Sequence, residues 1–100
     1  RLRTPAETAY EVRTQVLAPG AALGWETHPG TEITLVEAGE VTVQEFGACA
    51  PRPVPAGRTV VVGEGVPHVV VNTGPEPARL VVTTLLTPGP PATAPVPPAC

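Results

Sequence analysis

The sequence predicts an all-β domain whose antiparallel strands form a sandwich or a closed barrel. Valines cluster in short runs at residues 60–62, 69–71 and 81–82, and β-branched side chains favour strands. Fifteen prolines and ten glycines divide the 100 residues into short segments, which argues against long helices. Because these segments follow one another closely and no crossover helix separates them, the sheets are expected to be antiparallel.

We expect seven or eight strands, with glycine and proline marking the turns between them. In the segment over residues 40–46, Val41 and Val43 share one face with Glu45, and the residues between them face the other way. Residues 47–57 are rich in proline and are expected to form a loop. The strands that can be placed cover residues 10–17, 22–26, 32–37, 40–46, 58–62, 68–72 and 78–86.

A chain of this length suits one domain. We place the barrel domain at residues 1–86 and a proline-rich C-terminal tail at residues 87–100. Because prolines dominate the tail, it is expected to be extended and to lack packing of its own.

The composition excludes several functions. The chain has no serine, aspartate or lysine, which removes a serine nucleophile, a Schiff-base lysine and a P-loop lysine. A net charge of -3, six scattered basic residues and only three aromatic residues argue against a nucleic-acid partner. No apolar run is as long as a membrane span, so no membrane partner is expected. The absence of lysine and the abundance of alanine, proline, glycine and arginine suggest a GC-rich bacterial genome.

The two cysteines, Cys49 and Cys100, leave two interpretations open. They could form a disulfide, which the chain-entropy model credits with about 4 kcal/mol for so long a loop. Alternatively, both could be free thiols, because spacing alone does not fix connectivity. A disulfide would suit a secreted or periplasmic protein, and free thiols would suit a cytoplasmic one.

Two histidines are the main candidates for chemistry, and each lies beside a turn. His28 precedes a Pro-Gly turn, and His68 follows a Gly-Val-Pro segment. Glu26 lies two positions before His28, so on a strand the two side chains face the same way. Glu32 follows the Pro-Gly turn, which can fold it back beside His28. Imidazole and carboxylate groups together suit a first-row divalent metal ion.

The spacing of these residues resembles the two sequence motifs of the cupin superfamily, in particular its small single-domain, RmlC-like members. In the family the first motif reads glycine, five residues, His-any-His, three or four residues, glutamate, six residues and glycine. It corresponds here to Gly20, Glu26-Thr27-His28, Glu32 and Gly39. The second motif reads glycine, five residues, Pro-any-Gly, two residues, histidine, three residues and asparagine. It corresponds to Gly57, Gly63-Glu64-Gly65, His68 and Asn72. Both motifs lie in the expected order on a strand-rich chain.

The resemblance implies a double-stranded β-helix barrel, the antiparallel jelly roll of the cupins. It also implies one divalent transition metal ion, which could be iron, manganese, nickel, copper or zinc, with His28, Glu32 and His68 as ligands. Small cupins commonly pair, so the resemblance further implies a homodimer, in which exposed strand edges would be covered.

The sequence departs from the family pattern at two positions. Gly63 stands where the family usually has proline, which leaves a less rigid turn. Glu26 stands where the family usually has its first metal-binding histidine, so three histidines and one glutamate become two of each. Three interpretations of Glu26 stay open: a fourth metal ligand, a catalytic general base beside the metal, or a replacement that followed loss of metal binding.

The family resemblance implies a range of functions, and the fold does not choose among them. We favour a metal-dependent enzyme of the dioxygenase, decarboxylase or isomerase type that acts on a small oxygenated organic molecule. The alternative is a non-catalytic module that binds a small molecule or a sugar. Among the remaining polar residues, Asn72 is expected to be structural, whereas Tyr10 and Arg58 could face either the barrel interior or the solvent.

Overall fold

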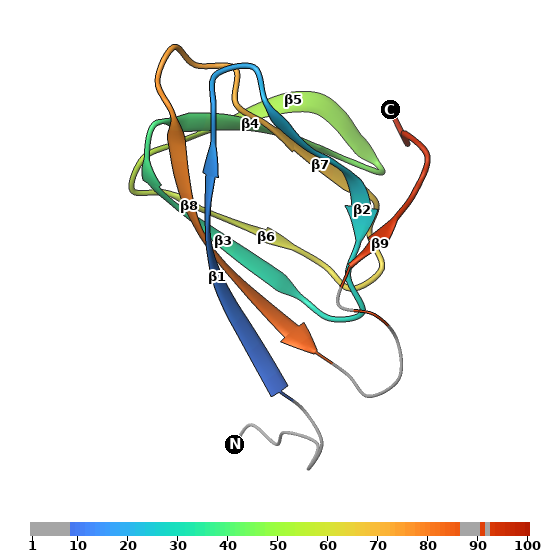
Figure 1. Cartoon of the computed structure of the whole chain (residues 1–100). Helices are drawn as coiled ribbons and strands as arrows, with labels where there is room; N and C mark the ends of the chain where they lie inside the picture. The colour runs from blue at the N-terminus through green and yellow to red at the C-terminus, as the bar shows by residue number, and fades with distance from the viewer. Residues whose placement is uncertain (1–8, 87–90, 92) are drawn as a thin grey trace.

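The protein consists of two antiparallel β-sheets packed face to face (Figure 1). This computed structural model describes residues 9–86, 91 and 93–100. The first sheet has the strand order β1-β8-β3-β6, and the second has the order β5-β4-β7-β2-β9. The strands are β1 (Ala9–Leu17), β2 (Ala22–Thr27), β3 (Glu32–Ala38), β4 (Glu40–Glu45), β5 (Ala48–Pro55), β6 (Thr59–Val62), β7 (His68–Val71), β8 (Ala78–Leu86) and β9 (Ala94–Pro95).

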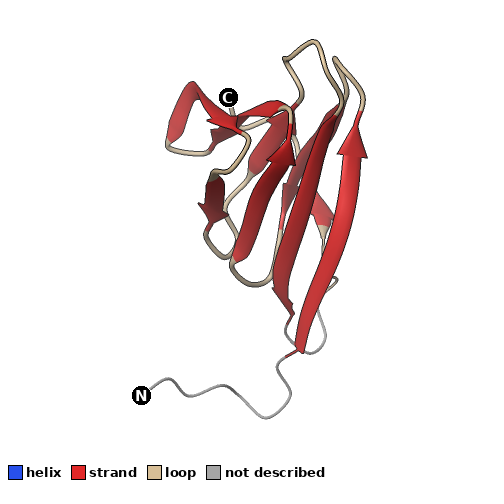
Figure 2. Ribbon diagram, turned by 90° about the vertical axis from the view of Figure 1, so that its left-hand side faces the viewer, coloured by secondary structure: helices blue, strands red, loops and turns tan. Residues whose placement is uncertain are grey.

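This architecture confirms the predicted all-β, antiparallel jelly roll. In the described residues, Figure 2 shows only strands and loops. The described part of the chain contains no helix long and apolar enough to span a membrane.

The core lies between the sheets, where alternate side chains of both layers meet. In β4, Val41 and Val43 are buried, as the alternation predicted, whereas Thr42 and Gln44 are only half-buried. Valine and leucine fill most of this interior, so the ionisable side chains that share it need partners there. The core residues are Leu17, Val36, Val41, Val43, Val54, Val60, Val62, Val70, Ala78, Leu80 and Val82.

The proline-rich segment after β4 is a strand, so the expected loop over residues 47–57 was wrong. Residues 48–55 form β5, an edge strand that pairs only with β4. Its prolines, at positions 51, 53 and 55, alternate along the strand. Their missing amides therefore fall on one side, which leaves the amides of Arg52 and Val54 for the ladder with β4. Proline at alternate positions is compatible with an edge strand, and it also blocks further pairing there.

The C-terminal segment contacts the barrel, contrary to the expected absence of packing. β9 pairs with β2, and Cys100 forms a disulfide with Cys49 at the start of β5. The two cysteine Cα atoms lie 5.5 Å apart. Of the two interpretations that the spacing left open, the structure therefore has the disulfide. The domain boundary after residue 86 stays a prediction, because residues 1–8, 87–90 and 92 lie outside the described residues.

Candidate metal centre

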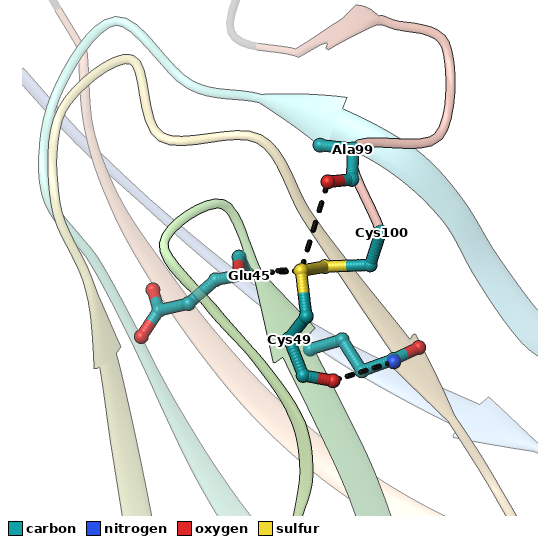
Figure 3. The surroundings of a disulfide bond; sticks show 5 residues. Glu45, Cys49, Ala99 and Cys100 are labelled. Carbon is teal, nitrogen blue, oxygen red and sulfur yellow. Dashed lines mark hydrogen bonds between the residues drawn. A yellow bond between two sulfur atoms is a disulfide. The ribbon is translucent and has the colours of Figure 1, made fainter.

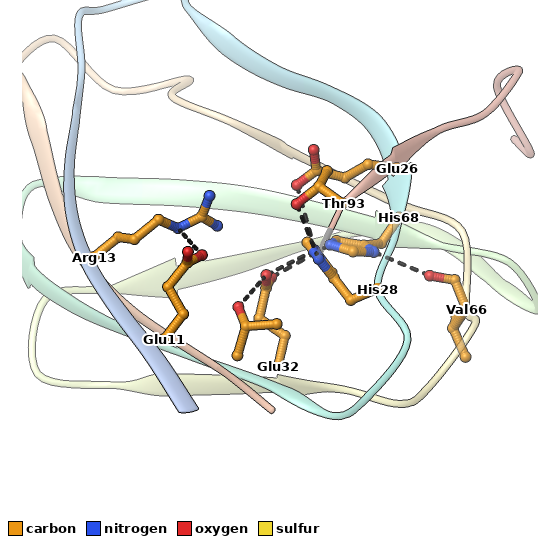
Figure 4. Close-up of polar contacts among 9 residues, drawn as sticks. Glu11, Arg13, Glu26, His28, Glu32, Val66, His68 and Thr93 are labelled. Atoms are coloured by element: carbon orange, nitrogen blue, oxygen red, sulfur yellow. Dashed lines mark hydrogen bonds and ion pairs between the residues drawn. The ribbon is translucent and has the colours of Figure 1, made fainter. Parts of the chain in front are cut away.

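Four ionisable side chains meet inside the barrel: Glu26, His28, Glu32 and His68 (Figure 4). One potential ligand atom from each lies within 4.8 Å of the others. His28, Glu32 and His68 are almost completely buried, and Glu26 is half-buried. The structure therefore brings together all four residues that the sequence singled out.

The strand pairing explains how residues from distant parts of the chain meet. Glu26 of β2 lies directly opposite His68 of β7. The turn after β2 places His28 between β2 and β3, and its carbonyl oxygen accepts a hydrogen bond from the amide of Gly65 at 2.9 Å. Glu32 opens β3 in the opposite sheet, so the cluster bridges the two sheets.

Both imidazole rings direct Nε2 towards carboxylate oxygens. His28 Nε2 lies 2.7 Å from Glu32 Oε2 and 3.4 Å from Glu26 Oε1. His68 Nε2 lies 3.4 Å from Glu32 Oε1. The ring centroids are 5.0 Å apart, with an angle of 43° between the ring planes. Glu32 therefore occupies the middle of the cluster, in contact with both histidines.

The outer nitrogen of each ring also has a polar neighbour. His68 Nδ1 lies 3.0 Å from the carbonyl oxygen of Val66, to which a protonated Nδ1 donates. His28 Nδ1 lies 3.4 Å from the hydroxyl oxygen of Thr93. Thr84 of β8 donates to Glu32 Oε2 at 3.4 Å. With a proton on Nδ1, each ring presents the Nε2 lone pair to the cluster, which is the tautomer that a metal ligand needs.

The pKa values of Glu32 and His68 reflect this contact. Burial alone would raise the pKa of Glu32, but the contacts and positive charges of His28 and His68 outweigh it and lower the pKa to about 2. Burial alone would lower the pKa of His68, but its contacts with Glu32 and with the Val66 carbonyl raise it above its ordinary value. The ionised Glu32 thus stabilises positive charge at the centre of the cluster.

The donor set fits a small divalent cation. A first-row ion holds nitrogen and oxygen ligands at about 2.0–2.2 Å, so ligands on opposite sides of it lie about 4 Å apart. Small side-chain rotations would bring the four atoms, now within 4.8 Å of one another, to such distances. His68 Nε2 is buried and makes no well-aligned hydrogen bond to any described residue, so it remains available for a cation. The described residues thus form a buried Glu/His cluster consistent with a metal site.

The fold and this cluster define a small jelly-roll protein with a metal-site-like group of two histidines and two glutamates. The family described as Cupin domain matches residues 13–84. This is most of the chain, which therefore belongs to the cupin domain family. The match confirms the resemblance that the two motifs indicated. A comparison with curated proteins finds no match.

Several solved structures of other proteins share this fold. A recombinant oxalate oxidase in complex with glycolate is 26% identical, with a TM-score of 0.72, over 92% of this chain and 56% of that chain. A Cupin 2 conserved barrel domain protein from Salinispora arenicola is 28% identical, with a TM-score of 0.69, over 87% of this chain and 71% of that one. A predicted oxalate decarboxylase from Thermotoga maritima is 25% identical, with a TM-score of 0.67, over 75% of this chain and 64% of that one. This chain thus spans little more than half of the oxalate oxidase.

Other polar residues occupy positions that the sequence left open or did not indicate. Tyr10 and Arg58 are both exposed and do not face the interior. On β1 the alternate positions Glu11 and Arg13 face inward, and their side chains lie 3.5 Å apart (Figure 4). Asn72 is fully buried and, as expected, structural.

Proposed function

We propose that this chain binds one divalent transition metal ion through His28, Glu32 and His68 and acts on a small carboxylate. The observation that carries the proposal is the convergence of four ligand atoms within 4.8 Å around a nearly buried centre. The bound ion would supply Lewis acidity or redox chemistry and would coordinate oxygen atoms of the substrate.

In this proposed reaction, Glu26 suits the role of a general base. Its side chain is 20% exposed, compared with 1% for His28 and 5% for Glu32. Of these three, Glu26 is therefore the one most accessible to a substrate that enters from solvent. Its carboxylate would hold or move a proton beside the substrate while the other three residues hold the ion.

Arg13 supports a carboxylate as the substrate class. On the inner face of the first sheet, Glu11, Thr84 and Glu32 lie in one row across β1, β8 and β3. Two strand spacings separate the ends of this row by about 10 Å. Arg13 is the next inner-face residue of β1, and its side chain is 33% exposed, so solvent reaches it. A guanidinium recognises a carboxylate through paired charge-assisted hydrogen bonds. The glycolate bound by the similar oxalate oxidase is a molecule of this class.

The second candidate is a non-catalytic binding module, and the position of Glu26 favours it. Glu26 Oε1 is already 3.4 Å from His28 Nε2. If this carboxylate also binds the ion, four protein ligands leave fewer positions for a substrate. A closed site of this kind would hold metal without turning over a substrate.

Metal content measured by ICP-MS tests the proposal, on protein purified without chelator or histidine tag. We expect about one equivalent of metal in the wild type, a loss of metal in His28→Ala and retention in Glu26→Gln. Turnover of oxalate, glycolate and other small 2-hydroxy and 2-oxo acids would then be assayed beside Arg13→Gln, which should raise KM. Absence of metal after reconstitution would overturn the proposal. A full metal complement without turnover of any acid would favour the binding module.

A further inference from the structure

The C-terminal segment over residues 93–100, here called the strap, is attached to both edges of the second sheet. β9 lies within the strap and pairs with β2, where Pro95 is opposite Glu26. The amide of Val96 donates to the carbonyl oxygen of Trp25 at 3.0 Å. At the other end, Cys100 is bonded to Cys49 of β5. Figure 3 shows this end against the β4–β5 turn, where Cys100 Sγ lies 3.6 Å from the carbonyl oxygen of Glu45.

The two attachments enclose the part of the sheet that carries the cluster. One row of paired residues crosses the whole sheet and runs through Ala48, Glu45, His68, Glu26 and Pro95. The strap leaves this row at Pro95 and returns beside Ala48, so it connects the two ends of the row. Four strand spacings of about 4.8 Å make the row about 19 Å long.

The connection between the two attachments is short. The five Cα–Cα steps from Pro95 to Cys100 reach at most about 17 Å, and the disulfide adds the 5.5 Å between the cysteine Cα atoms. Three of its eight residues are prolines, which favour extended backbone and lose little entropy on ordering. A short, stiff connection of this kind restricts how far either attachment can move from the other.

The strap also reaches the candidate metal centre directly. The Thr93 hydroxyl oxygen lies 3.4 Å from His28 Nδ1, whereas the other ring nitrogen, Nε2, faces Glu32 (Figure 4). A hollow of about 280 Å³ beside His28 has Ala94 of the strap in one wall and Glu64 and Gly65 of the β6–β7 turn in another. The strap therefore covers part of the outer side of His28.

We infer that the strap is a positioning element of the metal centre, in which Thr93 fixes the His28 ring and the Cys49–Cys100 disulfide holds Thr93 in place. This inference rests on the metal site proposed above. With the ion bound at Nε2, the ring proton of His28 would lie on Nδ1, from which it can be donated to the Thr93 hydroxyl. Partners of this kind typically contribute 10- to 100-fold to metal affinity.

Because the Cys49–Cys100 disulfide holds Thr93 in place, the metal centre should be sensitive to thiol redox state. A dithiol reductant would break the S–S bond by exchange, giving two cysteine thiols while the reductant forms its own disulfide, with two electrons and two protons transferred. The strap would then be held by its β-ladder with β2 and the Val96 amide, without a covalent attachment to the far edge of the sheet.

The test compares zinc release to a colorimetric chelator from wild type, Thr93→Val, Thr93→Ser and Cys49→Ser/Cys100→Ser. Thr93→Val removes the hydroxyl at nearly constant shape and should release zinc about tenfold faster or more, whereas Thr93→Ser should behave as wild type. The double cysteine variant should also release zinc faster. Thr59→Val, the same change at an exposed position of β6, is the matched control and should leave the rate unchanged.

Two further measurements keep the outcomes distinct. If the cysteine variant does not fold, Val96→Pro, which removes the amide that donates to Trp25, tests the strap with the disulfide intact. In zinc-loaded protein, where Nε2 binds the ion, ¹H–¹⁵N NMR should show the His28 Nδ1 proton exchanging with solvent faster in Thr93→Val than in wild type. Equal zinc release from wild type, Thr93→Val and the strap variants would overturn the inference. No zinc uptake by wild type would instead overturn the proposed metal site. An unchanged exchange rate of the Nδ1 proton in zinc-loaded Thr93→Val would overturn the positioning role.

Discussion

The two histidines of the cluster have the same chemistry but different structural support. His68 opens β7, an inner strand paired with β4 and β2, and its Nδ1 faces the carbonyl of Val66 only two residues away at 3.0 Å. His28 lies beyond the end of β2, and its Nδ1 faces Thr93, which is 65 residues away in sequence, at 3.4 Å. One ring is therefore fixed by its own strand and turn, and the other by a distant segment.

Two ligands with nearly identical burial are therefore not equally robust. Local backbone contacts form whenever the strand forms, because they require no further chain closure. A contact between residues far apart in sequence depends on ordering the whole segment that brings it, at an entropic cost. We therefore expect changes on the His68 side to act only through the stability of the fold, and changes on the His28 side to act on the metal centre as well.

We expect the strongest effect on the stability of the fold, whose pH dependence should differ between the metal-free and the metal-loaded protein. In metal-free protein, the low pKa of Glu32, about 2 rather than 4.5, stabilises the fold above pH 4.5, and this stability is lost as the pH falls towards 2. The raised pKa of His68 stabilises the fold below pH 6.5, and this contribution is lost as the pH rises through the raised value. Stability of the metal-free protein should therefore be highest between pH 4.5 and 6.5.

Metal loading should change the trend on the alkaline side, because the ion competes with the proton for His68. Below the raised pKa of His68, metal affinity should rise about tenfold per pH unit for each proton that the ion displaces. A tenfold change corresponds to about 1.4 kcal/mol. Thermal unfolding with and without zinc from pH 5 to 8 should show a gap that widens with pH. His68→Gln should remove the alkaline decline of the metal-free protein. A gap independent of pH would contradict this assignment of the cluster.

Substitution of Asn72, which anchors the far end of β7, should have a smaller but still large effect on the unfolding free energy. Its side-chain amide donates to the carbonyls of Leu17 at 2.9 Å and Glu76 at 2.8 Å and accepts from the amide of Gly74 at 2.9 Å. Asn72→Ala removes the partner of one buried carbonyl and of two part-buried backbone groups, leaves a gap at a fully buried position, and should cost about 3 kcal/mol of unfolding free energy in urea.

The matched control is Thr42→Ala, which removes an exposed hydroxyl pair with Thr73 and should change the unfolding free energy by less than about 0.5 kcal/mol. Equal effects of the two variants would mean that Asn72 does not anchor this region. If Asn72→Ala folds, its metal affinity at a temperature well below unfolding should be close to that of wild type. A selective loss of metal instead would break the proposed contrast between the two sides.

The parts of the site that could be predicted from the sequence are those encoded by short-range spacing. His28 and Glu32 are separated by one Pro-Gly turn, and His68 follows a turn triplet, so the motif spacing was enough to identify them. Val41 and Val43 likewise followed from alternation within one strand. In these cases the relevant geometry is determined within a few residues.

The parts that could not be predicted depend on pairing between distant segments. Thr84 meets Glu32 only because β8 and β3 pair in one register, and a shift by one residue would turn Thr84 to the other face. Thr93 reaches His28 through a strap whose disulfide the cysteine spacing left undecided. β5 was missed because proline at alternate positions has the composition of a loop, although it is compatible with the edge of a sheet.

The weakest effects on unfolding free energy and zinc affinity are expected from adding one methyl group to each of the two turns that flank the histidines. A Cβ on Gly30, in the turn after His28, would collide with the carbonyl oxygen of Leu85. A Cβ on Gly63, in the turn before His68, would meet only the Val66 side chain at 3.6 Å, an ordinary contact. Gly30→Ala should therefore lower the unfolding free energy by about 1–3 kcal/mol, because the backbone of β8 cannot easily give way.

Gly63→Ala should be neutral or stabilising by up to about 1 kcal/mol, because alanine restricts the unfolded chain and Gly63 does not have a positive φ. Zinc affinity and urea unfolding of both variants would show whether the two turns differ as their packing indicates. Gly30→Ala should weaken zinc binding as well as stability, since the displaced turn carries His28 and leads into Glu32. Gly63→Ala should leave zinc binding unchanged, because the His68 ring is held by its strand and by the Val66 carbonyl. If both variants lose zinc equally, the β6–β7 turn is as critical as the strap side, and the contrast between the two histidines does not hold.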